Sequence, residues 1–212
     1  MDDSQYMCGP LLIFVWVKMK KRKNYTQDVT IPDQVSCDVI GWVRSPYTER
    51  HGTPRQAILD NQPQGYVPVD AYIELNTDLV PQIALKDLDG FSRIWVLAFL
   101  HLNHHWNPTV RPPRGEKIRR GTLATRAPHR PNPIGLSALR LIRVEENRIY
   151  VEGIDLLDGT PILDIKPYVP YCDAFPDAKA GYVDELREKN EKEKEIWGQR
   201  EVASVPAKSE EK

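Results

Sequence analysis

The chain of 212 residues has little cysteine and no closely spaced cysteine pair. Its three cysteines, Cys8, Cys37 and Cys172, lie far apart, and none belongs to a CxxC motif. Such spacing argues against a disulfide framework and against a zinc ribbon. It is compatible with a reducing compartment, and we therefore predict a cytoplasmic protein.

Long hydrophobic runs are also scarce. The apolar run Leu11–Val17 is too short to cross a bilayer, and basic residues follow it rather than precede it. Met19 opens a sequence that is more typical of the start of a soluble protein. We interpret residues 1–18 as an upstream-start artefact or a disordered extension, with a weak signal peptide as the less favoured alternative. We expect no membrane association.

The chain further lacks a GxGxxG motif after any predicted strand, which excludes the usual Rossmann nucleotide pocket. A global excess of positive charge is missing too, because 29 Lys and Arg residues face 30 Asp and Glu residues. Locally, segment 111–130 holds one acid, Glu116, and seven basic residues: Arg111, Arg114, Lys117, Arg119, Arg120, Arg126 and Arg130. Such a cluster favours phosphate binding, although a solvated basic loop has the same composition.

What the chain does contain is a series of short segments with β-strand character. They cover residues 39–43, 72–75, 94–100, 121–125, 139–144, 149–154 and 162–165. Residues 81–88 are expected to form a short helix, and residues 103–121 to be irregular. Because little helix separates the strands, we predict a mainly β fold with an antiparallel β-barrel core, or alternatively a sandwich.

Composition divides the chain into three regions. Residues 1–35 are interpreted as a disordered N-terminal extension, and residues 36–183 as the β-barrel domain with one or two short helices. Residues 184–212 are dense in Glu, Lys and Arg and contain few apolar side chains. We predict that this last region is a solvated, helical C-terminal tail.

Two blocks combine Pro and Gly with charged side chains: Thr122–Ser137 (TLATRAPHRPNPIGLS) and Asp155–Tyr168 (DLLDGTPILDIKPY). Three prolines of the first block fix the backbone around Arg126, His129 and Arg130. A rigid crossover between strands would account for either block alone. Together they favour a binding site.

These blocks resemble the TsaA-like (TrmO) family of S-adenosylmethionine-dependent tRNA methyltransferases. The resemblance extends from about Val39 to Asp184 and includes Ile40–Tyr47, Thr53–Gln56, Gly90–Asn103 and Val110–Gly115. It implies a barrel-shaped homodimer that binds S-adenosylmethionine. It also implies methylation of the N6 of threonylcarbamoyladenosine in the tRNA anticodon loop.

The resemblance places cofactor contacts in five short stretches. They comprise Pro54, Arg55, Gln56, His101, Leu102, Arg126, Leu136, Asp155, Leu156, Leu157 and Asp158. Arg55 or Arg126 can pair with the cofactor carboxylate, and Asp155 or Asp158 can accept hydrogen bonds from its ribose or ammonium group. Each has a structural alternative: Arg55 as a loop residue, His101 as a strand cap, and Asp158 as the start of a tight turn.

The tRNA-facing surface is predicted from the basic cluster and the second block. It comprises Arg114, Arg119, Arg120, His129, Arg130, Lys166 and Tyr168. Methyl transfer to a conjugated nitrogen benefits from a base or from anion-stabilising donors. His129, Arg130 and Asp158 are the candidates, and we assign no catalytic base.

Two other function classes compete with a methyltransferase. The first is a non-catalytic RNA-binding barrel that keeps the basic loop. The second is a metalloenzyme built on His101, His104 and His105, but their spacing matches no established ligand pattern. We therefore expect no metal.

Overall fold

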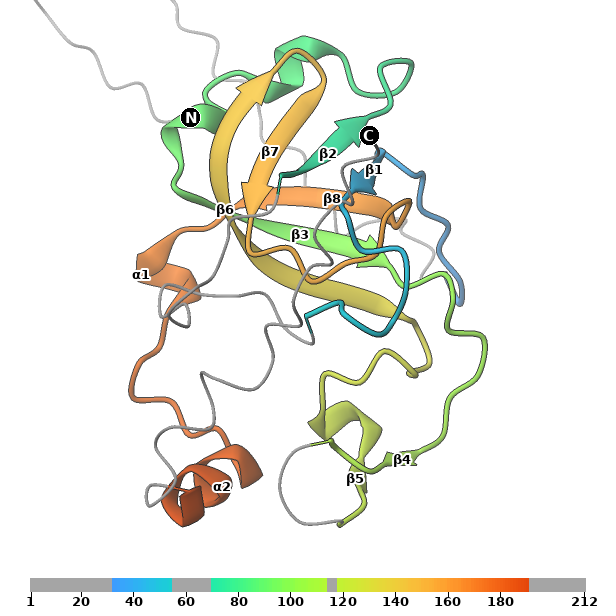
Figure 1. Cartoon of the computed structure of the whole chain (residues 1–212), viewed down its shortest axis with the longest axis vertical. Coiled ribbons are helices and arrows are strands. Elements are labelled where there is room, and N and C mark those ends of the chain that lie inside the picture. The colour runs from blue at the N-terminus through green and yellow to red at the C-terminus, as the bar shows by residue number, and fades with distance from the viewer. Residues whose placement is uncertain (1–31, 55–69, 114–117, 191–212) are drawn as a thin grey trace, which may run out of the picture. The chain divides into compact units, whose positions relative to one another are not determined.

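The computed structural model describes residues 32–54, 70–113 and 118–190, with side chains of the last helix described as far as Leu186 (Figure 1). Residues 1–36 and residues 37–212 form separate units. The elements below all belong to the second unit. Most of the predicted N-terminal extension, and the predicted tail from residue 191, lie outside the described residues.

Six antiparallel strands close into a barrel in the order β1-β2-β7-β6-β3-β8. The strands are β1 (Gly41–Arg44), β2 (Ala71–Leu75), β3 (Arg93–Phe99), β6 (Ile134–Glu145), β7 (Arg148–Glu152) and β8 (Pro161–Pro167). A separate two-stranded sheet pairs β4 (Thr109–Val110) with β5 (Arg120–Gly121). The predicted antiparallel barrel is confirmed, and the sandwich alternative is not what forms.

Alternation along the strands supplies the barrel core. On β3, Ile94, Val96 and Ala98 are buried, whereas Trp95 and Leu97 lie on the outer face. The remaining core side chains follow the same period of two, because successive side chains of a strand point to opposite faces. They include Val43, Ile73, Leu139, Leu141, Ile149, Val151 and Ile162.

The described helices are short. They are the 3-10 helices η1 (Gln82–Leu85), η2 (Leu88–Gly90) and η3 (Thr122–Ala124), and the α-helices α1 (Pro170–Asp173) and α2 (Tyr182–Asn190). The helix predicted over 81–88 is broken by Asp87, whose φ of 66° is left-handed. Helix α2 lies where the sequence predicts that the charged tail begins.

The strand predicted over residues 121–125 is wrong. Strand β5 ends at Gly121, and the chain then turns into η3. The reason is local hydrogen bonding: both the backbone N–H and the hydroxyl of Thr125 donate to the carbonyl of Thr122, at 3.1 and 2.8 Å. Thr side chains that bond their own backbone compete with strand pairing in this way.

Antiparallel pairing assigns the connections to two barrel ends. Strands β1, β3 and β7 finish at one end, from which the chain continues into residues 45–70, 100–133 and 153–160. We call this the long-loop end (Figure 1). Residues 76–92, the turn at 146–147 and the segment after Pro167 leave the opposite end.

Candidate functional site

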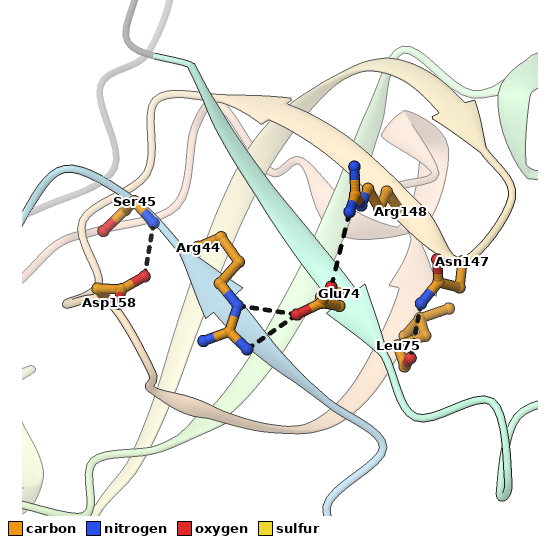
Figure 2. Close-up of polar contacts among 7 residues, drawn as sticks. All are labelled: Arg44, Ser45, Glu74, Leu75, Asn147, Arg148 and Asp158. Carbon is orange, nitrogen blue, oxygen red and sulfur yellow. Dashed lines mark hydrogen bonds and ion pairs between the residues drawn. The ribbon is translucent and has the colours of Figure 1, made fainter.

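Two connections of the long-loop end are joined through Ser45 and Asp158, which face each other in Figure 2. The backbone N–H of Ser45 donates to Oδ1 of Asp158 at 3.1 Å, and the Ser45 hydroxyl donates to the carbonyl of Leu156 at 3.0 Å. The N–H of Asp158 donates to the carbonyl of Tyr47 at 2.7 Å. Gly159 follows with a φ of +72°. Asp158 thus has the turn-forming role that was its structural alternative.

Asp155 occupies a different position in the same connection. Gly153 turns the chain with a φ of +83°, and the flanking Ile154 and Leu156 are buried in the core. Between them, half-buried Asp155 accepts a 2.6 Å hydrogen bond at Oδ1 from the hydroxyl of Ser137. The carboxylate is therefore attached to the barrel wall through strand β6.

The third connection, residues 100–133, is drawn together where it leaves strand β3 and rejoins the barrel at strand β6. The N–H of Leu100 donates to the carbonyl of Pro133 at 2.7 Å, and Asn103 bonds the carbonyl of Leu100 through its backbone and its side chain. A Cβ at Gly135 would lie only 3.1 Å from a Leu100 methyl carbon. This closure holds the start of β6 next to the turn that carries His101.

The basic segment is braced mainly by contacts with its own backbone. Thr122, which is 1% exposed, donates through its hydroxyl to the carbonyl of Asn107. The Arg119 guanidinium bonds the hydroxyl and the carbonyl of Thr109 at 2.8 and 2.9 Å. Arg130 donates to the carbonyl of Thr125 at 3.0 Å. The two cations Arg119 and Arg130 thus help to shape the loop that carries them.

Arg120 makes its contacts with helix α2. Its guanidinium lies 3.6 Å from the Glu185 carboxylate and 4.9 Å from the centre of the Tyr182 ring. The start of the C-terminal helix is therefore held against strand β5. An exposed pair of this kind contributes little stability on its own.

Most of the predicted cofactor residues lie on connections of the long-loop end or at the adjoining start of β6. Those described there are Pro54, His101, Leu102, Arg126, Leu136, Asp155, Leu156, Leu157 and Asp158. The predicted residues Arg55 and Gln56 lie outside the described residues. His101 is half-buried in a turn after β3, where its backbone N–H donates to the carbonyl of Phe99.

The predicted tRNA-facing residues do not all come together. Arg119, Arg120, His129 and Arg130 share the third connection, and Arg114 lies outside the described residues. Lys166 and Tyr168 lie near the opposite end of the barrel: the N–H of Tyr168 donates to the carbonyl of Arg93, where β3 begins. The Tyr168 ring packs 5.4 Å from that of Trp95, and Lys166 pairs with Asp164 at 2.7 Å.

A second set of charges covers the outer face of β1, β2, β6 and β7. The Glu74 carboxylate pairs with the Arg44 guanidinium at 2.8 Å and lies 3.9 Å from the Arg148 guanidinium (Figure 2). Arg143 lies 3.5 Å over the ring of Tyr150 and bonds Glu145 at 2.7 Å. That hydrogen bond lowers the pKa of Glu145 and raises the pKa of Arg143. We call this the paired face.

Neither a metal-binding cluster nor a membrane-spanning helix occurs in the described part of the chain. Within residues 32–54, 70–113 and 118–190, no three His, Cys, Asp or Glu side chains gather in a way that could hold a metal ion. His101, His104 and His105 lie within these ranges. The described helices include none with the length and apolarity needed to span a membrane.

The sequence reading missed Ser137 and Ser45 as organisers of the long-loop end. A usable signal exists for Ser137, because it lies at an inward position of β6, in phase with Leu139 and Leu141. A hydroxyl at such a position requires a buried partner. No comparable signal marks Ser45, whose bonds reach residues more than a hundred positions away in the chain.

The fold and the placement of the polar loops define a closed antiparallel β-barrel with a candidate site built from the loops of one end. Residues 42–174 match the family of the tRNA-methyltransferase O N-terminal domain. The chain belongs to this family, as the two sequence blocks predict.

Individual relatives agree with that assignment. The chain is 40% identical over 151 residues to a tRNA (adenine(37)-N6)-methyltransferase of Escherichia coli, an alignment that covers 68% of this chain and 61% of that protein. It is 35% identical to a Pyrococcus abyssi protein named "probable S-adenosyl-L-methionine-binding protein", covering 77% and 84%. The crystal structure of TrmO from Pseudomonas aeruginosa superposes with a TM-score of 0.56 at 40% identity, covering 71% and 63%. The chain thus spans about three fifths of the Escherichia coli relative's length.

Proposed function

We propose that this chain is an S-adenosylmethionine-dependent tRNA methyltransferase that acts on the N6 of an anticodon-loop adenosine. Threonylcarbamoyladenosine is the proposed base. The supporting names are those of the relatives, one of which is a tRNA (adenine(37)-N6)-methyltransferase. The observation that carries the proposal is the convergence of three connections at one barrel end, with the Asp155 carboxylate attached there by Ser137.

The residues at this end suit the chemistry of the cofactor. Arg126 is exposed and suits a carboxylate, whereas Asp155 suits hydroxyl or ammonium donors. Leu102 and Leu136 offer exposed apolar surface for an adenine ring. When bound, S-adenosylmethionine supplies an electrophilic methyl group. We prefer Asp155 to Asp158 as the direct contact, because Asp158 is exposed and both its side chain and its backbone N–H form the turn with Ser45 and Tyr47.

Proton removal from the substrate nitrogen is the remaining chemical need. A carbamoyl substituent weakens that nitrogen as a nucleophile and makes its proton more acidic, so a nearby base would help. Arg130 and Asp158 both hold loop backbone in place. His129 is exposed on the same connection as Arg126. His129, Arg130 and Asp158 remain the candidates, and we assign no catalytic base.

The same connection supplies the proposed tRNA surface. Arg119 and His129 are exposed, and Arg120 is half-buried beside helix α2. Guanidinium groups would meet phosphates, while an imidazole would stack on an unpaired base. An anticodon-loop base is already partly unstacked, so presenting it costs less than it would in a duplex. We also propose, from such a substrate, that the protein acts in the cytoplasm.

We also propose that the protein is a homodimer. Strands β3 and β6 leave an apolar strip on the outer face of the barrel, in which Phe99 is paired with Ile134 and Leu97 with Leu136. Phe99, Ile134 and Leu136 are 40, 43 and 49% exposed. A second copy that covers this strip would also cover Leu136, one of the proposed cofactor contacts. The cofactor site would then depend on dimer formation.

Methyl transfer with purified protein tests the function directly. Isotope-labelled S-adenosylmethionine is incubated with tRNA that carries threonylcarbamoyladenosine and with the same tRNA lacking the modification. Mass spectrometry of the digested nucleosides should reveal an N6-methylated product from the first tRNA. Tight tRNA binding without any transfer would instead support the non-catalytic RNA-binding barrel.

A further inference from the structure

Ser137 is an exception within the barrel interior. It is 5% exposed and lies on β6 opposite Val96 of β3. The next inward positions of β6 hold Leu139 and Leu141, which belong to the apolar core. A buried hydroxyl destabilises a core unless it is hydrogen-bonded. This position therefore requires a specific partner.

That partner is the Asp155 carboxylate, 18 residues further along the chain and 2.6 Å from the hydroxyl. A hydroxyl donating to a carboxylate at this distance forms a short, charge-assisted hydrogen bond. The buried serine needs an acceptor, whereas a half-exposed carboxylate can obtain its donors from water. The bond therefore satisfies the buried serine, and it also fixes the Asp155 carboxylate in one orientation, which its own solvation does not require.

The surrounding backbone leaves that carboxylate little other freedom. Gly153 turns the chain, and the buried Ile154 and Leu156 fix the segment on both sides of Asp155. These backbone contacts do not themselves fix the rotation of the Asp155 side chain. The Ser137 hydroxyl acts on that rotation, because it donates from a position of β6 that is paired with Val96 of β3.

We propose that Ser137 is a positioning residue, whose hydroxyl orients the Asp155 carboxylate for its contact with S-adenosylmethionine. This role rests on the proposed function, since it assigns Asp155 to the cofactor. It requires the two residues to act as one unit. Removing the hydroxyl should weaken cofactor binding only while Asp155 is present.

A double-mutant cycle measured by calorimetry with S-adenosylhomocysteine and S-adenosylmethionine tests this. Ser137→Ala should raise the cofactor Kd about tenfold. In the Asp155→Ala background the same substitution should have no further effect. Thr160→Val is the matched control, because Thr160 is also a buried hydroxyl residue at the long-loop end. It should bind cofactor as tightly as the unsubstituted chain.

Each outcome decides between positioning and a merely structural role. An unchanged Kd for Ser137→Ala overturns the proposal, as does a full tenfold loss that persists without Asp155. If Ser137→Ala does not fold by circular dichroism, Ser137→Cys, which keeps a similar volume but donates weakly, is judged by the same criteria. Absence of cofactor binding by the unsubstituted chain would contradict the proposed function itself.

Discussion

The long-loop end and the paired face are both rich in arginine, but they use it differently. On the paired face, Arg44 meets Glu74 and Arg143 meets both Glu145 and Tyr150, so strand geometry matches each cation with an acid or a ring. At the long-loop end, Arg119 and Arg130 bond backbone oxygens of their own connection, whereas Arg120 meets the exposed Glu185 of helix α2. Loops that cations brace in this way keep positive charge, because backbone carbonyls do not neutralise it.

The difference explains why net charge fails as a guide to function here. A sheet face that cancels its own charges offers little to a phosphate, whatever its arginine count. A loop segment with one acid among seven basic residues keeps a local positive field even in a chain of net charge −1. The comparison therefore predicts that equivalent substitutions in the two regions have unequal effects on ligands.

The largest difference is expected for the cofactor. Arg126→Ala and Asp155→Ala should each raise the Kd for S-adenosylmethionine about ten- to a hundredfold, because each leaves a charged ligand group without its partner. The matched variant Arg143→Ala on the paired face should bind normally. Calorimetry measures all three, with circular dichroism to verify folding. Equal Kd values for all three variants would show that the cofactor does not bind at the long-loop end.

The second difference concerns tRNA. Neutralising Arg114, Arg119 and Arg120 to Gln should weaken tRNA binding and flatten its dependence on log salt by roughly one unit per lost phosphate contact. The corresponding triple variant of the paired face replaces Arg44, Arg143 and Arg148.

Binding of that second variant should keep the salt slope of the unsubstituted chain. The measurement is tRNA affinity by fluorescence anisotropy over a range of salt concentrations. If both triple variants lose affinity equally, tRNA binding depends on the overall charge of the protein, and the contrast between the two regions has no functional meaning.

A smaller effect is expected where the long-loop end is tied together. Ser45→Ala removes the hydroxyl bond to the Leu156 carbonyl and the bond that the hydroxyl accepts from the Tyr47 N–H, but keeps the backbone bond to Asp158. The free energy of unfolding should fall by about 1–3 kcal/mol, since each hydrogen bond usually contributes about 0.5–1.5 kcal/mol. Urea denaturation measures it. Asn147→Ala, which removes a side-chain bond to the Leu75 carbonyl at the opposite end, provides the comparison.

The barrel itself was predictable because its strands carry the period-two pattern in their own residues. The sequence predicted only the second half of strand β6, residues 139–144. Its first residues, Ile134–Ala138, follow Pro133 and include Gly135, and both Pro and Gly are unfavourable in a strand. Their pairing with β3 supplies what local preference lacks. The short 3-10 turn of η3 depends on threonine hydroxyls that bond carbonyls, which composition does not reveal.

The site was predictable in its parts but not in its arrangement. The second block, residues 155–168, reads as one motif in the sequence. In the structure, strand β8 runs through it, and its seven residues extend over about 20 Å. Asp155 therefore begins the block at the long-loop end, whereas Lys166 and Tyr168 finish it at the other. Residues that are close in the sequence motif are thus far apart in space, because strand β8 runs from one end of the barrel to the other.

The smallest predicted effect belongs to the paired face and depends on pH. The hydrogen bond from Arg143 holds the pKa of Glu145 below its ordinary value of 4.5. A carboxyl whose pKa is depressed by folding contributes stability above its unfolded pKa and loses that contribution as the pH falls through the folded value. Because the Glu145 side chain is exposed, solvent screening keeps the contribution small. Glu145→Gln should therefore lower the melting temperature slightly at pH 7 and by less at about pH 3, because more of the unsubstituted carboxyl is protonated there. Differential scanning calorimetry at both pH values measures the difference, and an equal loss at both would mean that Glu145 acts through packing rather than through charge.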